Sequence, residues 1–112
     1  MQKINPKIFR EYDIRGIVGE DLSDEIAYVL GKAFAEYLKS FGTKKVLVAR
    51  DTRKTSESYQ KALMRGLTER GCVVYDMSIA IVSTLHFATE HWGIGGGIMV
   101  TASHNPPQYN GF

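Results

Sequence analysis

A serine in a short polar loop is the residue of this chain best suited to covalent chemistry. Residues 101–107 read TASHNPP, so Ser103 stands directly before His104 and is followed closely by two prolines. The prolines restrict the backbone and lower the entropy that is lost when the loop becomes ordered. A hydroxyl held on such a loop beside an imidazole suits a nucleophile or a phosphate carrier. Taken alone, the run is also typical of a plain turn, because serine, asparagine and proline are turn formers.

Arginines supply the positive charge that a phosphorylated serine would need. A phosphoserine carries roughly −1.5 to −2 charges at neutral pH and is bound best by charged donors. Arg15 follows a short predicted strand, and Arg50 and Arg53 flank Asp51 directly after another. Because loops after parallel strands gather at one edge of a sheet, we expect Arg15 and Arg53 to converge on Ser103. For Arg50 and Arg53, an ion pair with Asp51 or simple solvent exposure remains an alternative.

Other patterns that invite chemistry are better explained by structure. The glycine run 93–97 closes a predicted helix and precedes a strand, whereas a dinucleotide fingerprint follows a strand and opens a helix. His86 and His91 lie on different faces of that short helix, and no cysteine or carboxylate completes a zinc spacing around them. Trp92 is expected to pack at the helix end. A serine hydrolase is excluded because the sequence has no Gly-x-Ser-x-Gly elbow.

Helices and strands alternate along the chain. Amphipathic patterns predict helices over 24–41, 56–70 and 83–91, each closed by a glycine, and Ser23 is a suitable N-cap for the first. Strands are expected from apolar runs at 46–49, 72–75 and 98–101, with a further, shorter strand at 14–18. Continuous apolar runs are typical of strands that are covered on both faces. The alternation predicts an α/β fold, a three-layer α/β/α sandwich with a mixed, mostly parallel sheet.

Length and composition fit a single domain of ordinary kind. The chain has 112 residues, 44% of them hydrophobic and 23% charged, and its net charge of +2 gives no reason to expect a nucleic-acid or membrane partner. The single cysteine, Cys72, rules out an internal disulfide and fits the cytoplasm; we expect it to be buried and inert. The N-terminus has no apolar stretch of the kind found in signal peptides.

The last residues carry a strong turn signal. Asn110 and Gly111 form the pair that most favours a tight hairpin turn, and a strand is expected to follow such a turn. Only Phe112 follows. We therefore interpret the sequence as a piece of a longer protein.

At these residues the sequence resembles the α-D-phosphohexomutase superfamily. Residues 101–111 (TASHNPPQYNG) are similar to the phosphoserine loop of those enzymes almost position for position. Residues 9–16 (FREYDIRG) resemble the opening signature of the family, and residues 50–53 (RDTR) resemble a third landmark. Ala49 is a small departure, since many relatives have glycine there. The opening motif and Tyr109 together are similar to the bacterial phosphomannomutase/phosphoglucomutase branch.

The resemblance implies an intramolecular phosphotransferase. It would interconvert hexose 1-phosphate and hexose 6-phosphate, of mannose, glucose or both, through a phosphoserine and a hexose 1,6-bisphosphate. Ser103 is the implied phosphate carrier and Arg15 an implied catalytic and substrate-binding donor. Tyr12 is expected to line the sugar path, and His104 to be a hydrogen-bond partner. Mg²⁺ is the implied cofactor, bound through the phosphate on Ser103 and by ligands outside this chain.

The family has four domains, and this chain is similar to most of the first. Residues 1–112 are therefore interpreted as domain I, truncated just after the phosphoserine loop, with the remaining domains and a phosphosugar as its expected partners. The chain alone is expected to be inactive. A phosphoglucosamine mutase and a non-catalytic phosphate-binding module remain as alternatives.

Overall fold

The computed structural model describes residues 3–9, 13–102 and 105–112. Along the chain these form, in order, η1 (Pro6–Ile8), β1 (Arg15–Ile17), α1 (Asp24–Lys39), β2 (Lys45–Arg50), α2 (Ser56–Glu69), β3 (Val73–Ile79), α3 (Val82–His91), β4 (Gly96–Val100) and β5 (Tyr109–Gly111).

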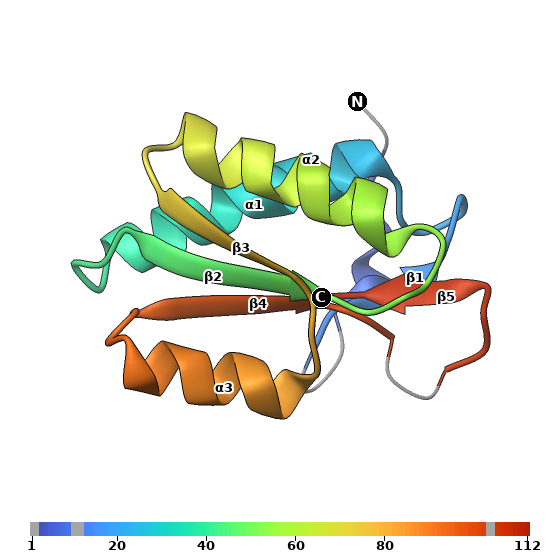
Figure 1. Ribbon diagram of the computed structural model, residues 1–112. Helices are drawn as coiled ribbons and strands as arrows, with labels where there is room; N and C mark the ends of the chain where they lie inside the picture. Colours follow the sequence, from blue (N-terminus) through green and yellow to red (C-terminus); the bar gives the residue numbers. More distant parts are fainter. Residues whose placement is uncertain (1–2, 10–12, 103–104) are drawn as a thin grey trace.

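A parallel sheet with the strand order β3-β2-β4 forms the middle layer. Helices α1 and α2 cover one face of this sheet and α3 covers the other (Figure 1). The predicted three-layer α/β/α sandwich is confirmed. The antiparallel part is a separate pair, β1 with β5, which lies beyond the end of β4 and is joined to it by a hydrogen bond from the Thr101 N–H to the Gly111 carbonyl, 2.9 Å long.

The first two helices follow the sequence pattern closely. The Ser23 hydroxyl accepts a hydrogen bond from the Ile26 N–H at 3.2 Å and caps α1, and two acidic residues follow in the first turn, where they favour the exposed N–H groups. Gly42 and Gly71, which follow the two helices, both have positive φ, as expected for helix stops. The N-cap and the glycine stops predicted from the sequence are confirmed.

Two glycines allow α1 and α2 to pack very closely. A Cβ atom at Gly31 would collide with the carbonyl oxygen of Leu63, and one at Gly66 would collide with the carbonyl oxygen of Tyr28. This helix pair forms one wall of the larger core, over the central strand β2. The smaller core, between the sheet and α3, consists of Leu47, Ala49, Leu85, Ala88 and Ile94.

Strand β3 differs from the prediction. It pairs with β2 alone among the described strands and is therefore an edge strand. Val73 is 43% exposed and Tyr75 41% exposed, so the expectation that the run 72–75 is covered on both faces is wrong. Apolar sequence alone does not distinguish a central strand from an edge. Cys72 itself is buried as expected, and burial raises the pKa of its thiol.

The Asn-Gly pair near the end of the sequence also differs from the prediction. Asn110 and Gly111 lie inside strand β5, which pairs with β1 in the register Gly16 opposite Asn110, so the predicted hairpin turn is wrong. The Asn110 side chain is fully buried and its Nδ2 donates to Thr55 Oγ1 at 2.8 Å and to Ser56 Oγ at 3.1 Å. These tertiary hydrogen bonds outweigh the local turn preference.

The end of α3 gives a further correction. Gly93 has a positive φ and follows the helix, as predicted, but Trp92 is 62% exposed instead of being packed at the helix end. Its ring lies edge-on to that of His91, which stacks on Phe87. None of the helices that the structure describes is long and apolar enough to span a membrane.

Candidate active-site loop

The segment that contains Ser103 connects β4 to β5. Strand β4 ends at Val100, so the loop begins at the carboxyl end of a parallel strand, where sites in open α/β sheets are usually found. Ser103 and His104 lie outside the described residues, as does Tyr12. The site is therefore described from the residues on both sides of Ser103, 101–102 and 105–109.

Asp51 and Arg53 form the support beneath this loop. They follow strand β2, and Asp51 Oδ2 lies 3.2 Å from Arg53 Nε, while Asp51 Oδ1 accepts the Arg53 N–H at 3.0 Å. Asp51 Oδ2 also accepts the hydroxyl of Thr101 at 2.7 Å, and Ser56 Oγ donates to Asp51 Oδ1. The ion pair proposed as an alternative role for Arg53 is thus present, and it contacts the first residue of the loop.

The hydrogen bonds around Asp51 change its acidity. Burial alone would raise the pKa of this carboxyl group, because it penalises the charged form. Hydrogen bonds from Ser56, from Thr101 and from the Arg53 backbone, together with the Arg53 charge, favour the carboxylate more strongly. The net result is a pKa below the usual value, so Asp51 is a stable anion at neutral pH.

The guanidinium group of Arg53 contacts the far side of the loop. Its Nη2 donates to the carbonyl oxygen of Asn105 at 2.7 Å, and its Nη1 donates to those of Pro106 at 2.9 Å and Tyr109 at 3.2 Å. Arg50 instead donates weakly to the backbone of Asp51, at 3.4 Å. Of the two flanking arginines, Arg53 is therefore the one that contacts the loop.

Arg15 reaches the same loop from β1. Its Nη1 donates to Asn105 Oδ1, and its Nε donates to Asp13 Oδ2 at 2.6 Å. Arg15 is the first residue of β1 and does not follow that strand as predicted. Arg15 and Arg53 both bind Asn105, two residues after Ser103. Their convergence on Ser103 itself stays a prediction, because Ser103 lies outside the described residues.

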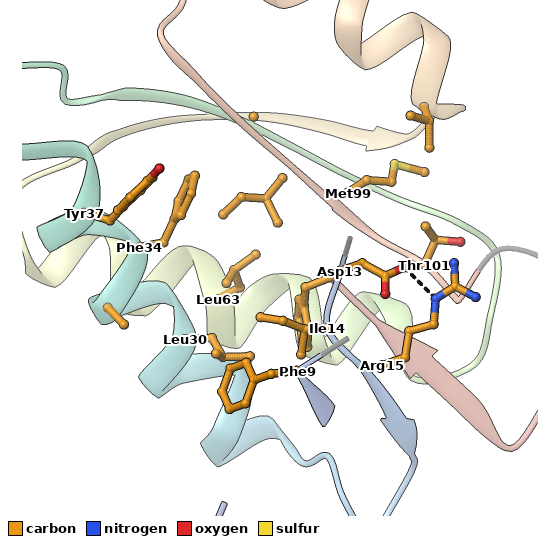
Figure 2. Close-up of a pocket in the computed structure, with 15 residues that line it drawn as sticks. Phe9, Asp13, Ile14, Arg15, Leu30, Phe34, Tyr37, Leu63, Met99 and Thr101 are labelled. Atoms are coloured by element: carbon orange, nitrogen blue, oxygen red, sulfur yellow. Dashed lines mark hydrogen bonds and ion pairs between the residues drawn. The ribbon is translucent and has the colours of Figure 1, made fainter. Parts of the chain in front are cut away.

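Arg15 also lies at the polar end of a cavity of about 930 Å³. Figure 2 shows Asp13, Arg15 and Thr101 together at one end of this cavity, and apolar side chains of α1, including Phe34 and Tyr37, toward the other. A negatively charged group would be favoured only at the arginine end. The rest of the lining is suited to apolar groups.

The described residues do not contain a metal site of their own. Among residues 3–9, 13–102 and 105–112, no group of three or more His, Cys, Asp or Glu side chains is arranged to hold a metal ion. The Asp51 carboxylate contacts the loop, but hydrogen bonds from Arg53, Ser56 and Thr101 already occupy both of its oxygens. The parts of the chain described here therefore do not fit a complete Mg²⁺ site.

Sequence reasoning missed several residues of the site. The sequence predicts Thr101 and Asn105 only as parts of the loop, and Asn110 as part of a turn, although each makes a hydrogen bond that fixes the loop. The sequence carries a signal for Thr101, because this residue has a hydroxyl group and ends an apolar strand, while the acidic residue Asp51 follows another strand. No local signal identifies the contacts of Asn105 and Asn110, because their partners lie more than fifty residues away.

Comparison with known proteins adds to this geometry. Residues 6–112 match the family described as phosphoglucomutase/phosphomannomutase, alpha/beta/alpha domain I. The chain is 50% identical over 103 residues to a phosphomannomutase of Escherichia coli, covering 92% of this chain and 22% of that protein. It is 43% identical over 107 residues to a phosphoglucomutase/phosphomannomutase of Thermococcus kodakarensis, covering 94% and 24%.

A solved structure is also similar. The crystal structure of a phosphoglucomutase/phosphomannomutase family protein from Burkholderia thailandensis matches with a TM-score of 0.92 at 36% identity, over 98% of this chain and 26% of that one. This chain thus spans about a quarter of the length of these similar proteins.

Proposed function

This chain belongs to the phosphoglucomutase/phosphomannomutase α/β/α domain I family, and from that premise we propose that its full-length parent is a phosphohexomutase with Ser103 as the phosphate carrier. The parent would interconvert the 1-phosphate and the 6-phosphate of a hexose. Mannose and glucose are the favoured sugars, because the similar proteins are named phosphomannomutase and phosphoglucomutase/phosphomannomutase.

One observation supports this proposal above all. Two arginines from different parts of the fold, Arg15 on β1 and Arg53 after β2, donate to the same loop residue, Asn105. A loop that must present a phosphoserine needs a fixed backbone and positive charge close by, because phosphoryl transfer is catalysed mainly by positioning and charge stabilisation. A plain surface turn would need neither.

The proposed reaction has two balanced transfers. In the first, the bond between the Ser103 oxygen and phosphorus breaks, and a bond forms between phosphorus and the free hydroxyl oxygen of a hexose phosphate. The hydroxyl proton is passed on to the Ser103 oxygen, which leaves a neutral serine and a hexose 1,6-bisphosphate. The bisphosphate then turns around within the site, and its other phosphate returns to Ser103 by the reverse steps.

Residues near the loop are assigned roles in this reaction. Arg15 would donate to the phosphate, since its Nη2 makes no hydrogen bond with the described residues and its Nη1 is held against the loop by Asn105. Tyr12 would line the path of the sugar and His104 would hydrogen-bond near Ser103. Mg²⁺, which would stabilise negative charge on the phosphate, would be held by the Ser103 phosphate and by ligands outside this chain. No step above depends on the metal.

Intact mass spectrometry of the full-length parent tests the proposal. After incubation with glucose 1,6-bisphosphate, the parent should gain the mass of one phosphoryl group, and peptide mapping should locate it at Ser103. The Ser103→Ala variant should gain no mass and should show no mutase turnover with mannose 1-phosphate or glucose 1-phosphate. Its melting temperature should match that of the wild type, because the hydroxyl is needed for chemistry and not for packing.

The same measurements distinguish the alternatives. A parent that binds the bisphosphate without gaining mass would be a phosphate-binding module and not a mutase. Faster turnover of glucosamine 6-phosphate than of either neutral sugar phosphate would identify a phosphoglucosamine mutase. Retention of turnover by Ser103→Ala would show that another residue carries the phosphate.

A further inference from the structure

We infer that Arg53 is a positioning residue for phosphoryl transfer, which holds Ser103 in place by fixing the backbone on the far side of its loop. The inference rests on the proposed function and extends it to a residue that contacts the loop backbone. The alternative for Arg53 is a purely structural ion pair with Asp51.

The contacts of Arg53 are concentrated on the loop backbone. Its two terminal nitrogens donate to three carbonyl oxygens, of Asn105, Pro106 and Tyr109, at 2.7–3.2 Å. These three residues lie 52, 53 and 56 positions from Arg53 along the chain, so no local chain geometry brings them to Arg53. A structural ion pair with Asp51 would require none of these bonds.

The same unit also holds the near side of the loop. Asp51 orients the Arg53 side chain through Nε at 3.2 Å, and its Oδ2 accepts the Thr101 hydroxyl at 2.7 Å. Thr101 precedes Ser103 by two residues and Asn105 follows it by two. The Asp51–Arg53 pair therefore joins the two ends of the five-residue segment that has Ser103 at its centre.

The chemistry of this contact requires a guanidinium group. Its planar fork presents several N–H donors in fixed directions, so one group can bind Asp51 on one side and backbone carbonyls on another. A lysine ammonium at the same place would keep the charge but could not reproduce this arrangement. The Arg53 side chain is only 17% exposed, and its bonds to the Asn105 and Tyr109 carbonyls are partly buried, whereas the bond to the Pro106 carbonyl is exposed.

A positioning role has a defined kinetic signature. A displacement of about 1 Å at a reacting atom can cost about a hundredfold in rate. A residue that acts through the loop backbone changes the geometry of Ser103 but not the groups that bind the hexose phosphate. Loss of Arg53 should therefore lower kcat while KM for the hexose phosphate stays nearly constant.

The test uses the full-length parent and the Arg53→Ala variant. We expect kcat to fall about ten- to a hundredfold and phosphorylation of Ser103 by glucose 1,6-bisphosphate to slow by a similar factor. Added guanidinium should restore part of the activity, because the truncation leaves a space of its shape between Asp51 and the loop carbonyls. Arg65→Ala is the charge-matched control: this exposed arginine on α2 contacts the Tyr28 ring, and its loss should leave kcat unchanged.

A second variant keeps the test decisive if Arg53→Ala does not fold. Arg53→Lys retains the charge and most of the stem, and we expect it to show the same loss of kcat, because it lacks the planar fork. The inference is wrong if Arg53→Lys has wild-type kcat, if KM rises with the fall in kcat, or if guanidinium gives no rescue. Absence of turnover in the wild-type parent would instead contradict the proposed function.

Discussion

At the scale of single residues, the loop is held by side chains that use several polar atoms at once. Asp51 accepts hydrogen bonds from Arg53, Ser56 and Thr101, and Arg15 binds Asp13 with one nitrogen and Asn105 with another. Removing one such residue leaves partners without a hydrogen bond, which costs more than the net value of an ordinary hydrogen bond. Their loss is expected to affect both the loop and its chemistry.

Replacement of Arg15 by alanine in the parent should reduce catalysis more than stability. A hydrogen bond from a charged group is worth about 1.5–3 kcal/mol, which corresponds to about one to two decades in rate. Because Arg15 is proposed to donate to the phosphate, we expect kcat to fall and KM for the hexose phosphate to rise. Steady-state kinetics and thermal unfolding measure the two effects separately.

Lys7→Ala is the control for this prediction, since Lys7 is an exposed cation in η1. It should change neither kcat nor the melting temperature. Activity that survives in Arg15→Ala, together with a lower melting temperature, would mean that Arg15 is purely structural.

Replacement of Asp51 by asparagine should remove a pH-dependent part of the stability. The folded-state pKa of Asp51 lies below its unfolded value of about 3.9. Asp51 therefore contributes stability that is fully present above this pH and is lost as the pH falls through the lower, folded pKa. We expect Asp51→Asn to cost about 1–3 kcal/mol at pH 7 and progressively less below about pH 4.

Urea unfolding of the wild type and of Asp51→Asn between pH 7 and pH 2 measures the difference between their unfolding free energies. Taking the difference cancels the titration of the other carboxyl groups, which the two proteins share. Glu57→Gln is the matched control, because the Glu57–Lys61 pair lies at 3.2 Å on the exposed surface of α2, where such pairs contribute little. A constant difference between Asp51→Asn and wild type at all pH values would contradict a lowered Asp51 pKa.

At the scale of helices and strands, the contact between α1 and α2 depends on two residues that lack side chains. Gly66→Ala would normally stabilise a helix by about 1 kcal/mol. Here the added Cβ collides with the carbonyl oxygen of Tyr28 on the other helix, so we expect a loss of about 1–3 kcal/mol from overpacking. Equilibrium unfolding of the wild type and of Gly66→Ala shows whether the substitution lowers or raises the unfolding free energy.

Thr68→Ala provides the comparison on the same helix. Thr68 is exposed, and its hydroxyl donates back to the Met64 carbonyl at 2.8 Å, so its replacement should change the unfolding free energy by no more than about 0.5 kcal/mol. Stabilisation by Gly66→Ala would show that the helices can move apart without cost.

Elements with a clear repeating pattern were predictable from the sequence, and those held by distant contacts were not. The period of apolar residues, the Ser23 cap and the glycine stops locate α1 and α2 almost to the residue. Strand β5 was missed because Asn110 and Gly111 have the strongest local preference for a turn. That preference is overcome by pairing with β1 and by the buried bonds from Asn110 to Thr55 and Ser56, which no local pattern reveals.

The candidate site shows the same division. The loop and Arg53 could be identified from residue types and from their positions after strands, because parallel strands bring such segments to one edge. Arg15 was identified by its charge alone, since it begins the antiparallel strand β1 and does not follow a parallel one. Their joint contact with Asn105 could not be predicted, since it depends on side-chain geometry across the whole fold. Whether Arg53 belonged to an ion pair or to the site was also open, and the structure shows that it contacts both Asp51 and the loop.

At the scale of the whole molecule, strand β4 lies at one edge of the described parallel sheet. Over Gly96–Val100 it pairs with β2, and among the described strands it has no second partner along that length. Residues 109–111, where a turn was expected, form β5, which is paired with β1. Strand β4 also lines the cavity beside Arg15, through Gly97, Ile98 and Met99.

The isolated 112-residue chain should show no mutase turnover, even at high protein concentration and with Mg²⁺ present. The described residues include both sides of the loop and its two arginines, but they contain no group of acidic side chains that could bind the metal. The cavity beside Arg15 is lined mainly by apolar residues of α1 and β4, which offer a hexose few hydrogen bonds. Phosphoryl transfer depends on positioning and charge stabilisation, and an open, one-sided site supplies little of either.

A coupled assay with mannose 1-phosphate and glucose 1,6-bisphosphate measures the rate of turnover by the isolated chain. The same chain with Ser103→Ala is the control, because it reports any contaminating mutase from the expression host. Turnover above that control would mean that this piece contains a complete site, and the assignment of metal and sugar ligands to the rest of the parent would then be wrong.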